Sequence, residues 1–470
     1  MKPKPQHLFF IGIVGHAMRG IALAAIRQGH VVTGLDESVA EGDAGAAWVD
    51  AHGIDWSRTP QPSQLDGVDL VIISGGTSAD YPMVLEAERR HIPVQSFAEY
   101  LGELTRSKHV ISVAGTHGKT TTTSLITWLL ESAGRHPDYL IGIRPFNFDS
   151  SARLDDADTF VVEGDEYKAS SLDPHPKLSY YHPDTLVLTS VEHDHPDVYP
   201  TMKDYVAAFE QVVGHLPKTG RLVACADSAT VMNIAAKANC DVITYGLDQG
   251  EFTARHIAYE PAGISYNVVK NGEPIGRLTV GVYGRHNVLN SLAATAVALS
   301  EGLTWEQIQA GAATFKGAYR RTNLLTPVDS PVLVVDDYAH HPTEAEAMIR
   351  MMKLHFPDRR LLVVYRPHTY SRTQTLLSEY HQAFSGADHL YLTDVEPARE
   401  AANQRTVSGQ EILDGLPPKL KANSVFEPDR DRLIARLKSD AKPGDMVLCM
   451  TVSGYGKLAE ELAAAFSPKH

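Results

Sequence analysis

The chain has 470 residues, enough for two to four domains of ordinary size. Hydrophobic residues make up 43% of it and charged residues 21%, which is typical of a globular protein and excludes a disordered one. The formal net charge of −14 argues against nucleic acid as a partner, because binding a phosphate backbone needs a concentrated positive surface.

The cysteines and the apolar stretches bear on the cellular compartment. The spacing of Cys225, Cys240 and Cys449 fits no zinc pattern, so we expect reduced thiols. No apolar run approaches the roughly 18 residues of a membrane span. The N-terminal apolar stretch follows lysines, as in a signal peptide, but glycines and charged residues interrupt it. We therefore expect a cytoplasmic protein without a membrane partner.

The first block of the chain reads as a βαβ unit. "LFFIGI" (8–13) predicts a buried parallel strand, and Gly12, Gly15 and Gly20 surround a turn into a helix over roughly 17–28. Two further strands are predicted, one ending at Asp36 and one over 70–76. A glycine-rich first turn of this kind places phosphates at a helix N-terminus.

The second block begins after a polar stretch at 104–109. "VAGTHGKTTTTS" (113–124) follows the strand-like residues 109–113 and predicts a strand that turns sharply into a helix. Further strands are predicted at 158–163 and 185–190, and helices at 201–214 and 286–301. The alternating segments 252–257, 263–268 and 276–281 predict antiparallel strands at one edge of the sheet.

The third block begins near residue 325. The apolar runs "PVLVVDDY", "RLLVVYRP", "HLYLTD" and "DMVLCMT" alternate with helical stretches, which favours a parallel sheet. The predicted fold class is α/β with three domains, at 1–107, 108–325 and 326–470.

The stretch "GTHGKTTT" (115–122) carries the clearest chemistry. Backbone N–H groups of a glycine turn at a helix N-terminus bind anions, Lys119 can reach the β- and γ-phosphates of a nucleotide, and the Thr120 hydroxyl can bind Mg²⁺. The usual phosphate loop has a glycine where this chain has Val113, so the loop is a shortened variant. The alternative is a surface loop with a lysine in it by chance.

Two polar clusters follow two later strands of the same block. The residues concerned are Glu163, Asp165 and Glu166, then Glu192, His193, Asp194, His195 and Asp197. Because parallel strands end at the same edge of a sheet, both clusters are expected beside the phosphate loop, where they would hold Mg²⁺ against a nucleotide. The alternatives are a solvated acidic rim, or a zinc site at His193 and His195 that no cysteine supports.

Three further motifs stand at element ends. "YGRHNVLNSLAA" (283–294) spaces His286, Asn287 and Asn290 over one helical turn, where asparagines face a base edge or cap the helix. "VVDDYAHHP" (334–342) and "RPHTYSR" (366–372) follow strands that are successive in the chain, and polar clusters at such strand ends are where ligands bind in α/β sheets.

Taken in this order, the motifs "GIVGHAMRGIA", "GTHGKTTT", "EGDEY", "EHDHPD", "GRHNVLN", "AYRR" and "DDYAHHP" resemble the Mur ligase family over nearly the whole chain. The resemblance implies three domains: a Rossmann-like N-terminal domain for a UDP-sugar, a central P-loop ATPase-type mixed sheet, and a Rossmann-like C-terminal domain for the incoming amino acid.

The first motif is similar to that of members acting on UDP-N-acetylmuramate in peptidoglycan biosynthesis. The implied reaction phosphorylates the lactyl carboxylate of the sugar with ATP, and an amine then attacks the acyl phosphate. ATP and Mg²⁺ are the implied cofactors. The implied partners are UDP-N-acetylmuramate and L-alanine, or a peptide that begins with L-alanine.

The resemblance also implies roles for individual residues. Lys119, Glu163, His195 and Arg321 would be catalytic. Thr120 would bind one Mg²⁺, and Glu163 with His195 would bind the other. The ATP-binding residues would be Gly115, Thr116, Gly118, Lys119, Thr120, Thr121, His286, Asn287, Asn290, Arg321 and Asp336. The UDP-sugar would be bound by Gly12, Gly15, His16, Met18, Asp36 and Ser74. The amino acid would be bound by Tyr338, His340 and Arg372.

Two branches of the family form this bond. "GIRPFNFDSSARL", "EGDEYKAS" and "KLSYYHP" resemble ligases that add the tripeptide L-alanyl-γ-D-glutamyl-meso-diaminopimelate. "DDYAHHPTE", "RPHTYSRT" and "TDVEPARE" resemble those that add free L-alanine, and this part would present the amine. Thr369 stands where the alanine branch usually has an arginine, which favours the peptide. We favour free L-alanine, with the tripeptide as the alternative.

Two other classes of protein compete. A nicotinamide-dependent dehydrogenase would explain the N-terminal glycines and Asp36, but their spacing is not G-x-G-x-x-G and the phosphate loop is left without a role. A P-loop ATPase that drives motion, or a binding module, would hydrolyse or bind ATP without a UDP-sugar and an amine.

Overall fold

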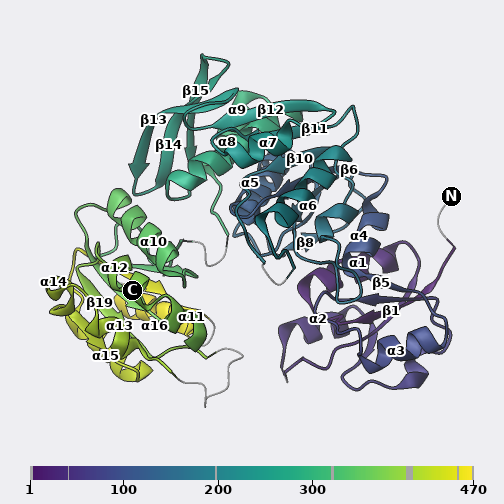
Figure 1. Ribbon diagram of the computed structural model, residues 1–470, viewed down its shortest axis with the longest axis horizontal. Helices are drawn as coiled ribbons and strands as arrows, with labels where there is room; N and C mark the ends of the chain where they lie inside the picture. The colour runs from purple at the N-terminus through teal and green to yellow at the C-terminus, as the bar shows by residue number, and fades with distance from the viewer. Residues whose placement is uncertain are drawn as a thin grey trace. The chain divides into compact units, whose positions relative to one another are not determined.

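The structure is a computed structural model that describes residues 4–40, 42–195, 198–318, 322–397, 406–452 and 455–467. Within these residues the chain forms three sheets, met in chain order and flanked by helices (Figure 1). The predicted α/β class with three sheet-containing parts is confirmed. No helix of the described chain is both long and apolar enough to cross a membrane.

The first sheet is wholly parallel, with the strand order β3-β2-β1-β4-β5. Its strands are β1 (His7–Ile11), β2 (Val31–Leu35), β3 (Asp55–Ser57), β4 (Leu70–Ile73) and β5 (Val94–Ser96). Its helices are η1 (Pro62–Leu65), α1 (His16–Arg27), α2 (Ala44–Ala51), α3 (Pro82–Arg89) and α4 (Phe97–Thr105). This is the order of a doubly wound nucleotide-binding sheet, as the first block predicted.

The second sheet has the strand order β15-β14-β13-β12-β11-β10-β6-β9-β7-β8 in the described chain. Its strands are β6 (His109–Ala114), β7 (Asp138–Leu140), β8 (Ala152–Arg153), β9 (Thr159–Gly164), β10 (Thr185–Leu188), β11 (Arg221–Cys225), β12 (Asp241–Gly246), β13 (Phe252–Glu260), β14 (Gly263–Lys270) and β15 (Glu273–Val280). Its helices are α5 (Lys119–Ser132), η2 (Lys177–Tyr180), α6 (Met202–Gly214), α7 (Ala229–Ala235), α8 (Arg285–Ser300) and α9 (Trp305–Ala313). The segments β13, β14 and β15 lie at one edge, as predicted.

The third sheet has the strand order β16-β17-β21-β18-β19-β20. Its strands are β16 (Asn323–Leu324), β17 (Leu333–Asp337), β18 (Arg360–Tyr365), β19 (His389–Leu392), β20 (Ser424–Phe426) and β21 (Asp445–Met450). Its helices are α10 (Pro342–His355), α11 (Tyr370–Thr375), α12 (Leu377–Ala383), α13 (Gly409–Asp414), α14 (Pro418–Lys421), α15 (Arg430–Asp440) and α16 (Gly456–Phe466).

The third sheet is covered on both faces, which explains its continuous apolar runs. Val335 and Val363 belong to one apolar cluster, while their neighbours Val334 and Val364 belong to another. Since successive side chains of a strand point to opposite faces, each cluster occupies one face of the sheet. Helix ends are defined by polar caps; α10, for example, begins with Pro342, and Glu344 accepts the His341 N–H at 3.1 Å.

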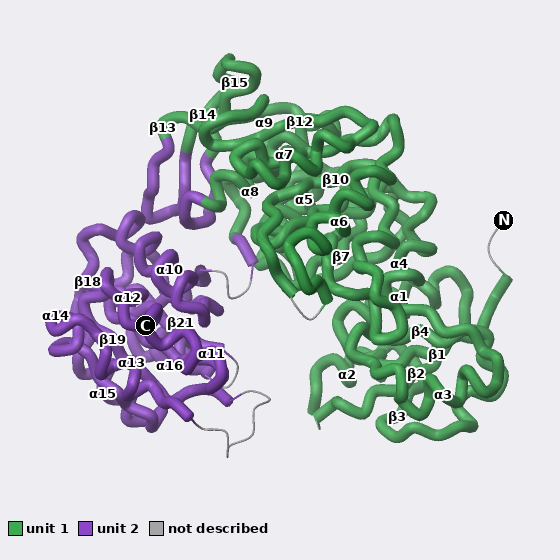
Figure 2. Tube along the Cα trace, viewed as in Figure 1, with its two compact units in different colours: residues 1–256, 266–278, 286–316 green, residues 257–265, 279–285, 317–470 purple. Residues whose placement is uncertain are grey.

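The described chain divides into two compact units (Figure 2). The first contains residues 1–256, 266–278 and 286–316, and therefore holds the first sheet and most of the second. The second contains residues 257–265, 279–285 and 317–470, so that the third sheet is joined by ends of β13 and β14 and by the residues before α8.

A buried histidine ties these pieces of the second unit together. His355, at the end of α10, is 1% exposed. Its Nδ1 lies 2.7 Å from the carbonyl oxygen of Glu260, and its Nε2 accepts the N–H of Gly284 at 3.1 Å. The rings of Tyr259 and Tyr283 pack edge-on against it. Burial lowers the pKa of His355, so the neutral ring with its proton on Nδ1 satisfies both partners.

Candidate active site

Three strand ends meet at one edge of the second sheet. The strand β6 lies between β9 and β10 and pairs with both in parallel, with Ala114 opposite Gly164 on one side and Leu188 on the other. The phosphate loop therefore has the carboxylates after β9 and the polar residues after β10 as its neighbours. The predicted convergence of these clusters is confirmed.

Two glycines allow the tight turn of the phosphate loop. Gly115 has φ +127°, and a Cβ there would lie 2.3 Å from the Thr189 hydroxyl. Gly118 has φ +82°, and a Cβ there would lie 2.4 Å from Oδ1 of Asn290. Positive φ is costly for any residue with a Cβ, and in addition both positions lack the space for one. The loop thus packs directly against the end of β10 and against α8.

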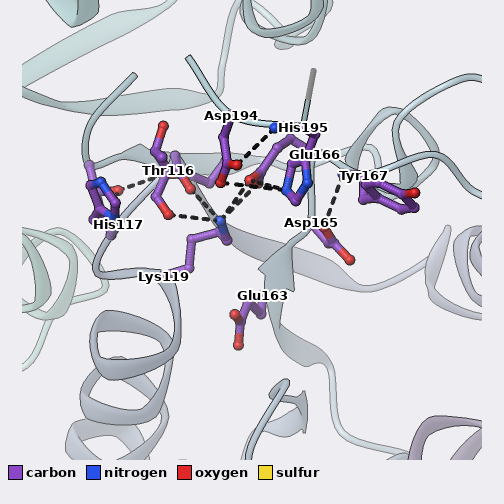
Figure 3. A network of polar contacts seen from close by, with 12 residues as sticks. Thr116, His117, Lys119, Glu163, Asp165, Glu166, Tyr167, Asp194 and His195 are labelled. Atoms are coloured by element: carbon purple, nitrogen blue, oxygen red, sulfur yellow. Dashed lines mark hydrogen bonds and ion pairs between the residues drawn. The ribbon is translucent and has the colours of Figure 1, made fainter. Parts of the chain in front are cut away.

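Lys119 is the first residue of α5 and points back over the loop. Its Nζ donates to the carbonyl oxygens of Gly115 at 2.5 Å and Thr116 at 3.2 Å, and to Oε1 of Glu166 at 2.9 Å. The Glu166 side chain is 1% exposed. Figure 3 shows the ammonium group between the loop and this carboxylate. The pair keeps a positive charge at the helix N-terminus, where the backbone already favours anions.

Glu163 and Thr120 form a second contact at the start of α5. The Thr120 hydroxyl donates to Glu163 Oε1 at 2.8 Å, and the Gly142 N–H donates to Oε2 at 2.8 Å. Burial raises the pKa of Glu163, whereas these two hydrogen bonds and the Lys119 charge oppose that rise. A hydroxyl that donates its proton to a carboxylate keeps its lone pairs available for a cation, which fits the metal-binding role expected of Thr120.

A third group of ligand atoms lies on the other side of Lys119. Side-chain atoms of Glu166, Asp194 and His195 lie within 4.8 Å of one another, a spacing that suits a bound cation. His195 Nε2 is 3.5 Å from Glu166 and 3.7 Å from Asp194. The structure thus groups His195 with Glu166 and Asp194, whereas in Figure 3 the Glu163 carboxylate points away from this group. A metal ion shared by Glu163 and His195 stays a prediction.

The expected adenine-binding residues lie at the start of α8. Asn287 and Asn290 are 8% and 6% exposed, and Asn290 Nδ2 donates to Asn287 Oδ1 at 2.8 Å. His286 is exposed. Because Asn290 contacts the loop at Gly118, its position is determined by packing against the phosphate loop, and its role toward a base remains a prediction. Thr121 is half-buried in the first turn of α5.

The glycine turn after β1 is built as predicted. Gly12 has φ +86° and packs on Ser74, while Gly15 and His16 are exposed where α1 begins. Asp36 is buried and closes the turn by accepting the Val14 N–H at 3.1 Å, so its carboxylate has a structural partner. Ser74 contacts the Thr77 hydroxyl at 3.0 Å.

Gly20 and Met18 both lie in α1, where the first helix was predicted. Gly20 lies inside α1, within the helix predicted over roughly 17–28, and a Cβ there would approach Ala152 of β8 to 3.1 Å. The Met18 side chain is 3% exposed and belongs to the apolar core, and a Cβ on Gly15 would lie 3.8 Å from its Cγ.

Two arginines at this helix N-terminus were missed by sequence reasoning. Arg19 lies 2.8 Å from Nδ1 of His16. Burial lowers the pKa of His16, and the positive charges of Arg19 and Arg144 lower it further. Arg19 follows the glycines by one turn and could have been found from its spacing, whereas Arg144 comes from a distant loop.

The residues expected to bind ribose and amino acid lie in the second unit. Asp336 is 2% exposed at the end of β17, and Asp337 accepts the N–H groups of Thr322 at 2.7 Å and Ala339 at 2.8 Å. Arg321 lies outside the described residues, as does Asp197.

The amino-acid-binding candidates come together around one histidine. The His340 ring packs edge-on against Tyr338 and against His368, and an Arg372 guanidinium nitrogen lies 3.3 Å from His368 Nδ1. His368 was in the cluster "RPHTYSR" but was not among the predicted site residues. A surface pocket beside it is lined by Thr369, Ser371, Arg372, Thr375 and Leu376.

Thr369 adopts an unusual backbone conformation in this pocket. It has φ +64° and ψ 140°, and it precedes the first residue of α11. A β-branched residue is strained there, since this region favours glycine. Strain of this kind is common where a backbone is held for binding.

These features define a class of protein: an α/β protein with a phosphate loop at a helix N-terminus, a lysine above it and two groups of possible cation ligands beside it. Three family models match the chain in order. They are "Mur ligase family, catalytic domain" at residues 7–109, "Mur ligase middle domain" at 113–298 and "Mur ligase, glutamate ligase domain" at 320–451. The chain belongs to the Mur ligase family.

Individual relatives agree with the family models. The chain is 37% identical over 456 residues to a UDP-N-acetylmuramate–L-alanine ligase of Rubrobacter xylanophilus, covering 97% of this chain and 98% of that one. A UDP-N-acetylmuramate-alanine ligase structure from Thermotoga maritima matches 98% of both chains with a TM-score of 0.78 at 23% identity.

A third relative belongs to the alternative branch. It is a UDP-N-acetylmuramate:L-alanyl-gamma-D-glutamyl-meso-diaminopimelate ligase structure from Neisseria meningitides, 31% identical with a TM-score of 0.62. It matches 67% of this chain and 100% of its own. The family resemblance predicted from the motifs is confirmed, and membership favours a ligase over a dehydrogenase.

Proposed function

We propose that the protein is an ATP-dependent ligase that joins the lactyl carboxylate of UDP-N-acetylmuramate to the amine of L-alanine, in the cytoplasm and for peptidoglycan synthesis. The observation that carries the proposal is the phosphate loop with Lys119 and Glu166, in a chain with a 37% identical UDP-N-acetylmuramate–L-alanine ligase relative over nearly its full length.

The proposed reaction has two steps. The lactyl carboxylate attacks the γ-phosphorus of ATP, and the bond from that phosphorus to the β,γ-bridging oxygen breaks to release ADP. The amine then attacks the carbonyl carbon of the acyl phosphate, phosphate leaves, and the nitrogen loses a proton. Phosphorylation is needed because a carboxylate is a poor electrophile.

The chain's own contribution to the first step is charge and position. A carboxylate and a triphosphate repel each other, so positive groups have to converge on both. Lys119 would exchange the Gly115 and Thr116 carbonyl oxygens for phosphate oxygens while Glu166 keeps the ammonium in place. Arg321 is proposed to contact the γ-phosphate. Gly115, Thr116, Gly118, Thr120 and Thr121 would supply the rest of the phosphate site.

Mg²⁺ fits the residues beside the loop. Thr120 with Glu163 would hold one ion, and His195 with Glu166 and Asp194 would hold a second. Oxygen-rich groups of this kind are the ligands that Mg²⁺ prefers. When bound, Mg²⁺ would neutralise charge on the phosphates.

The UDP-sugar is proposed to bind the glycine turn of the first sheet, with its diphosphate at the N-terminus of α1 beside Gly15 and His16. The domain limits 1–107, 108–325 and 326–470 are proposed as the functional division, one for each substrate.

The second candidate function is the same bond with the tripeptide. It is favoured by Thr369. A free alanine has a carboxylate that needs cations, and this pocket has the guanidinium of Arg372 but a threonine at position 369, where the alanine branch usually has a second arginine. Tyr338, His340 and Arg372 would bind the amine substrate in either case.

A product assay tests both. The enzyme is mixed with ATP, Mg²⁺ and UDP-N-acetylmuramate, with either L-alanine or the tripeptide, and the product mass is measured. We expect the alanine adduct, with ADP released only when both other substrates are present. ADP release without an amine would point to a different kind of ATPase, and a tripeptide adduct formed far faster would select the second candidate.

A further inference from the structure

A hairpin-like loop follows β9 and contacts the first sheet. Residues 165–178, here named the β9 hairpin, are paired by hydrogen bonds from Ala169 N–H to the His175 carbonyl at 2.8 Å and from Lys177 N–H to the Tyr167 carbonyl at 3.0 Å. At its tip the Ser171 hydroxyl donates to the Thr77 carbonyl at 2.6 Å. The β9 hairpin therefore extends from the phosphate-loop edge of the second sheet to the turn that follows β4.

One side chain of the β9 hairpin lies against that turn. A Cβ placed on Gly75, next to Ser74, would lie 3.7 Å from Lys177 Cε and 4.0 Å from its Nζ. The Lys177 side chain is 19% exposed, and its Nζ lies 2.5 Å from Oδ2 of Asp165. The ammonium group is thus close to Gly75, which follows Ser74, a residue proposed for the UDP-sugar.

The same side chain also lies near the Tyr167 ring, which contacts His195 beside the phosphate loop. Lys177 Nζ is 6.0 Å from the centre of the Tyr167 ring, and that ring contacts His195 at 4.9 Å. Asp165, the partner of Lys177, is next in sequence to Glu166, the partner of Lys119. Lys177 therefore places a positive charge on the route between the two proposed substrate sites.

We propose that Lys177 determines specificity for the UDP-sugar by ion-pairing with its lactyl carboxylate and holding that carboxylate toward the phosphate loop. The inference rests on the proposed function and deepens it. The lactyl carboxylate is the part of this substrate that has to approach the triphosphate, so it needs a cation on the way. Asp165 keeps the ammonium group in place before the substrate arrives, and the substrate carboxylate then shares it.

The test compares two nucleotide sugars by calorimetry without ATP. UDP-N-acetylglucosamine has the same nucleotide and ring as UDP-N-acetylmuramate but lacks the lactyl carboxylate. Lys177→Met removes the charge and keeps the apolar stem. We expect it to weaken UDP-N-acetylmuramate binding by about tenfold or more, the value of a charge-assisted hydrogen bond, and to leave UDP-N-acetylglucosamine binding unchanged.

Lys168→Met is the matched control. It removes the same charge from the same hairpin, and Lys168 also lies over the Tyr167 ring, at 5.8 Å. It should leave the binding of both sugars unchanged. If Lys168→Met weakened UDP-N-acetylmuramate as much as Lys177→Met, a general charge effect would replace the proposal.

A double variant distinguishes direct contact of Lys177 with the substrate carboxylate from neutralisation of Asp165 by Lys177. In Lys177→Met, Asp165 loses its partner and would itself repel the substrate carboxylate. Lys177→Met/Asp165→Asn removes that repulsion. We expect the double variant to stay weak for UDP-N-acetylmuramate; recovery of wild-type affinity would overturn direct contact by Lys177. Should Lys177→Met fail to fold by its thermal melting profile, Lys177→Gln is measured in its place.

The wild-type enzyme distinguishes the two levels of the proposal. If it binds neither sugar, the proposed function fails and the role of Lys177 with it. If it binds UDP-N-acetylmuramate more tightly but the Lys177 variants lose affinity for both sugars or for neither, the proposed function stands and the role of Lys177 is overturned. Equal wild-type affinity for the two sugars overturns it as well.

Discussion

The ammonium group of Lys119 lies 2.9 Å from a carboxylate oxygen of Glu166, with the carboxylate 1% exposed and the lysine side chain 15% exposed. Burying an ion pair carries a desolvation penalty, so the pair is poor evidence for stability, and at a helix N-terminus it is better evidence for a site that binds anions. Lys119 begins the helix that follows β6 and Glu166 follows β9, and these two strands are neighbours in the sheet, which gives the pair its fixed position.

Replacing Lys119 should separate chemistry from binding. Lys119→Met removes the positive charge nearest the loop carbonyls, and we expect kcat to fall by about 10²-fold or more. Binding of the UDP-sugar to the first sheet should survive. Steady-state kinetics and calorimetry check the two parts, and near-normal turnover would refute the role. Because Glu166 is then left unpaired, Lys119→Met/Glu166→Gln should regain thermal stability without regaining activity.

The cation ligands should be revealed by the magnesium dependence. His195→Gln and Glu163→Gln each remove one proposed ligand, so we expect the Mg²⁺ concentration for half-maximal activity to rise before ATP binding is lost. His193→Gln is the control, because His193 Nε2 lies 2.8 Å from the Tyr199 carbonyl and is outside the ligand group. An unchanged Mg²⁺ dependence in both ligand variants would mean that the carboxylates form only a solvated rim.

The phosphate loop should not tolerate a side chain at Gly118. Gly118→Ala places a Cβ at φ +82° and 2.4 Å from Asn290 Oδ1, so we expect ATP binding to be lost. Gly134→Ala is the matched control, with φ +77° and open space around the position. Both variants pay about 1–2 kcal/mol for the left-handed backbone. Equal ATP affinity in the two variants, measured by calorimetry, would contradict a role for the contact with Asn290.

Thr369 gives opposite predictions for the two candidate amines. If free L-alanine is the substrate, Thr369→Arg adds a second cation beside Arg372, and the KM for alanine should fall. The fall should correspond to about 1–2 kcal/mol of binding free energy, the value of one partly exposed charge-assisted hydrogen bond. If the tripeptide is the substrate, the arginine meets an amide, and the KM for the tripeptide should rise. A variant that gains nothing with alanine would count against free alanine.

His355 should make the second unit less stable in acid. Burial lowers its pKa from the ordinary 6.5, so the unfolded chain binds a proton more readily than the folded one. The stabilisation is complete above pH 6.5 and is lost as the pH falls through that value toward the lower folded pKa. Protonation would also turn Nε2 from acceptor into donor against the Gly284 N–H.

Urea unfolding of wild type and His355→Gln at several pH values checks this. We expect the variant to be less stable at pH 8 and to show a shallower loss of stability on acidification. His182→Gln serves as the comparison, because burial also lowers the pKa of His182 but that residue lies in the first unit. Identical pH slopes in wild type and His355→Gln would eliminate the histidine as the cause.

The fold was largely predictable because its signals are local. Continuous apolar runs and glycine turns identified strands in each of the three sheets, and the rule that parallel strands end at one edge brought the polar clusters to the phosphate loop. Short strands such as β3, β16 and β20 were missed, since two or three residues carry no periodicity, and the longer strands β11 and β12 were missed as well.

The partners within the site were less predictable because they depend on tertiary packing. Sequence reasoning expected Glu163 to share a metal ion with His195, which stays a prediction, and it did not foresee that Glu166 and Asp194 lie within 4.8 Å of His195. The contact between Gly118 and Asn290 joins residues far apart in the chain. Lys177 lies in a loop with no pattern of its own, so its position could be known only from the structure.

The second unit is assembled from segments that lie far apart in the chain, which affects how the protein folds during synthesis. Glu260 and Gly284 leave the ribosome well before His355, the residue that binds both. Chain synthesis proceeds at about 5–20 residues per second, so these early segments wait several seconds for their partner. We expect the hairpin of β13 and β14 to remain exposed to chaperones during that interval, and a nascent chain arrested near residue 340 to leave it without its anchor.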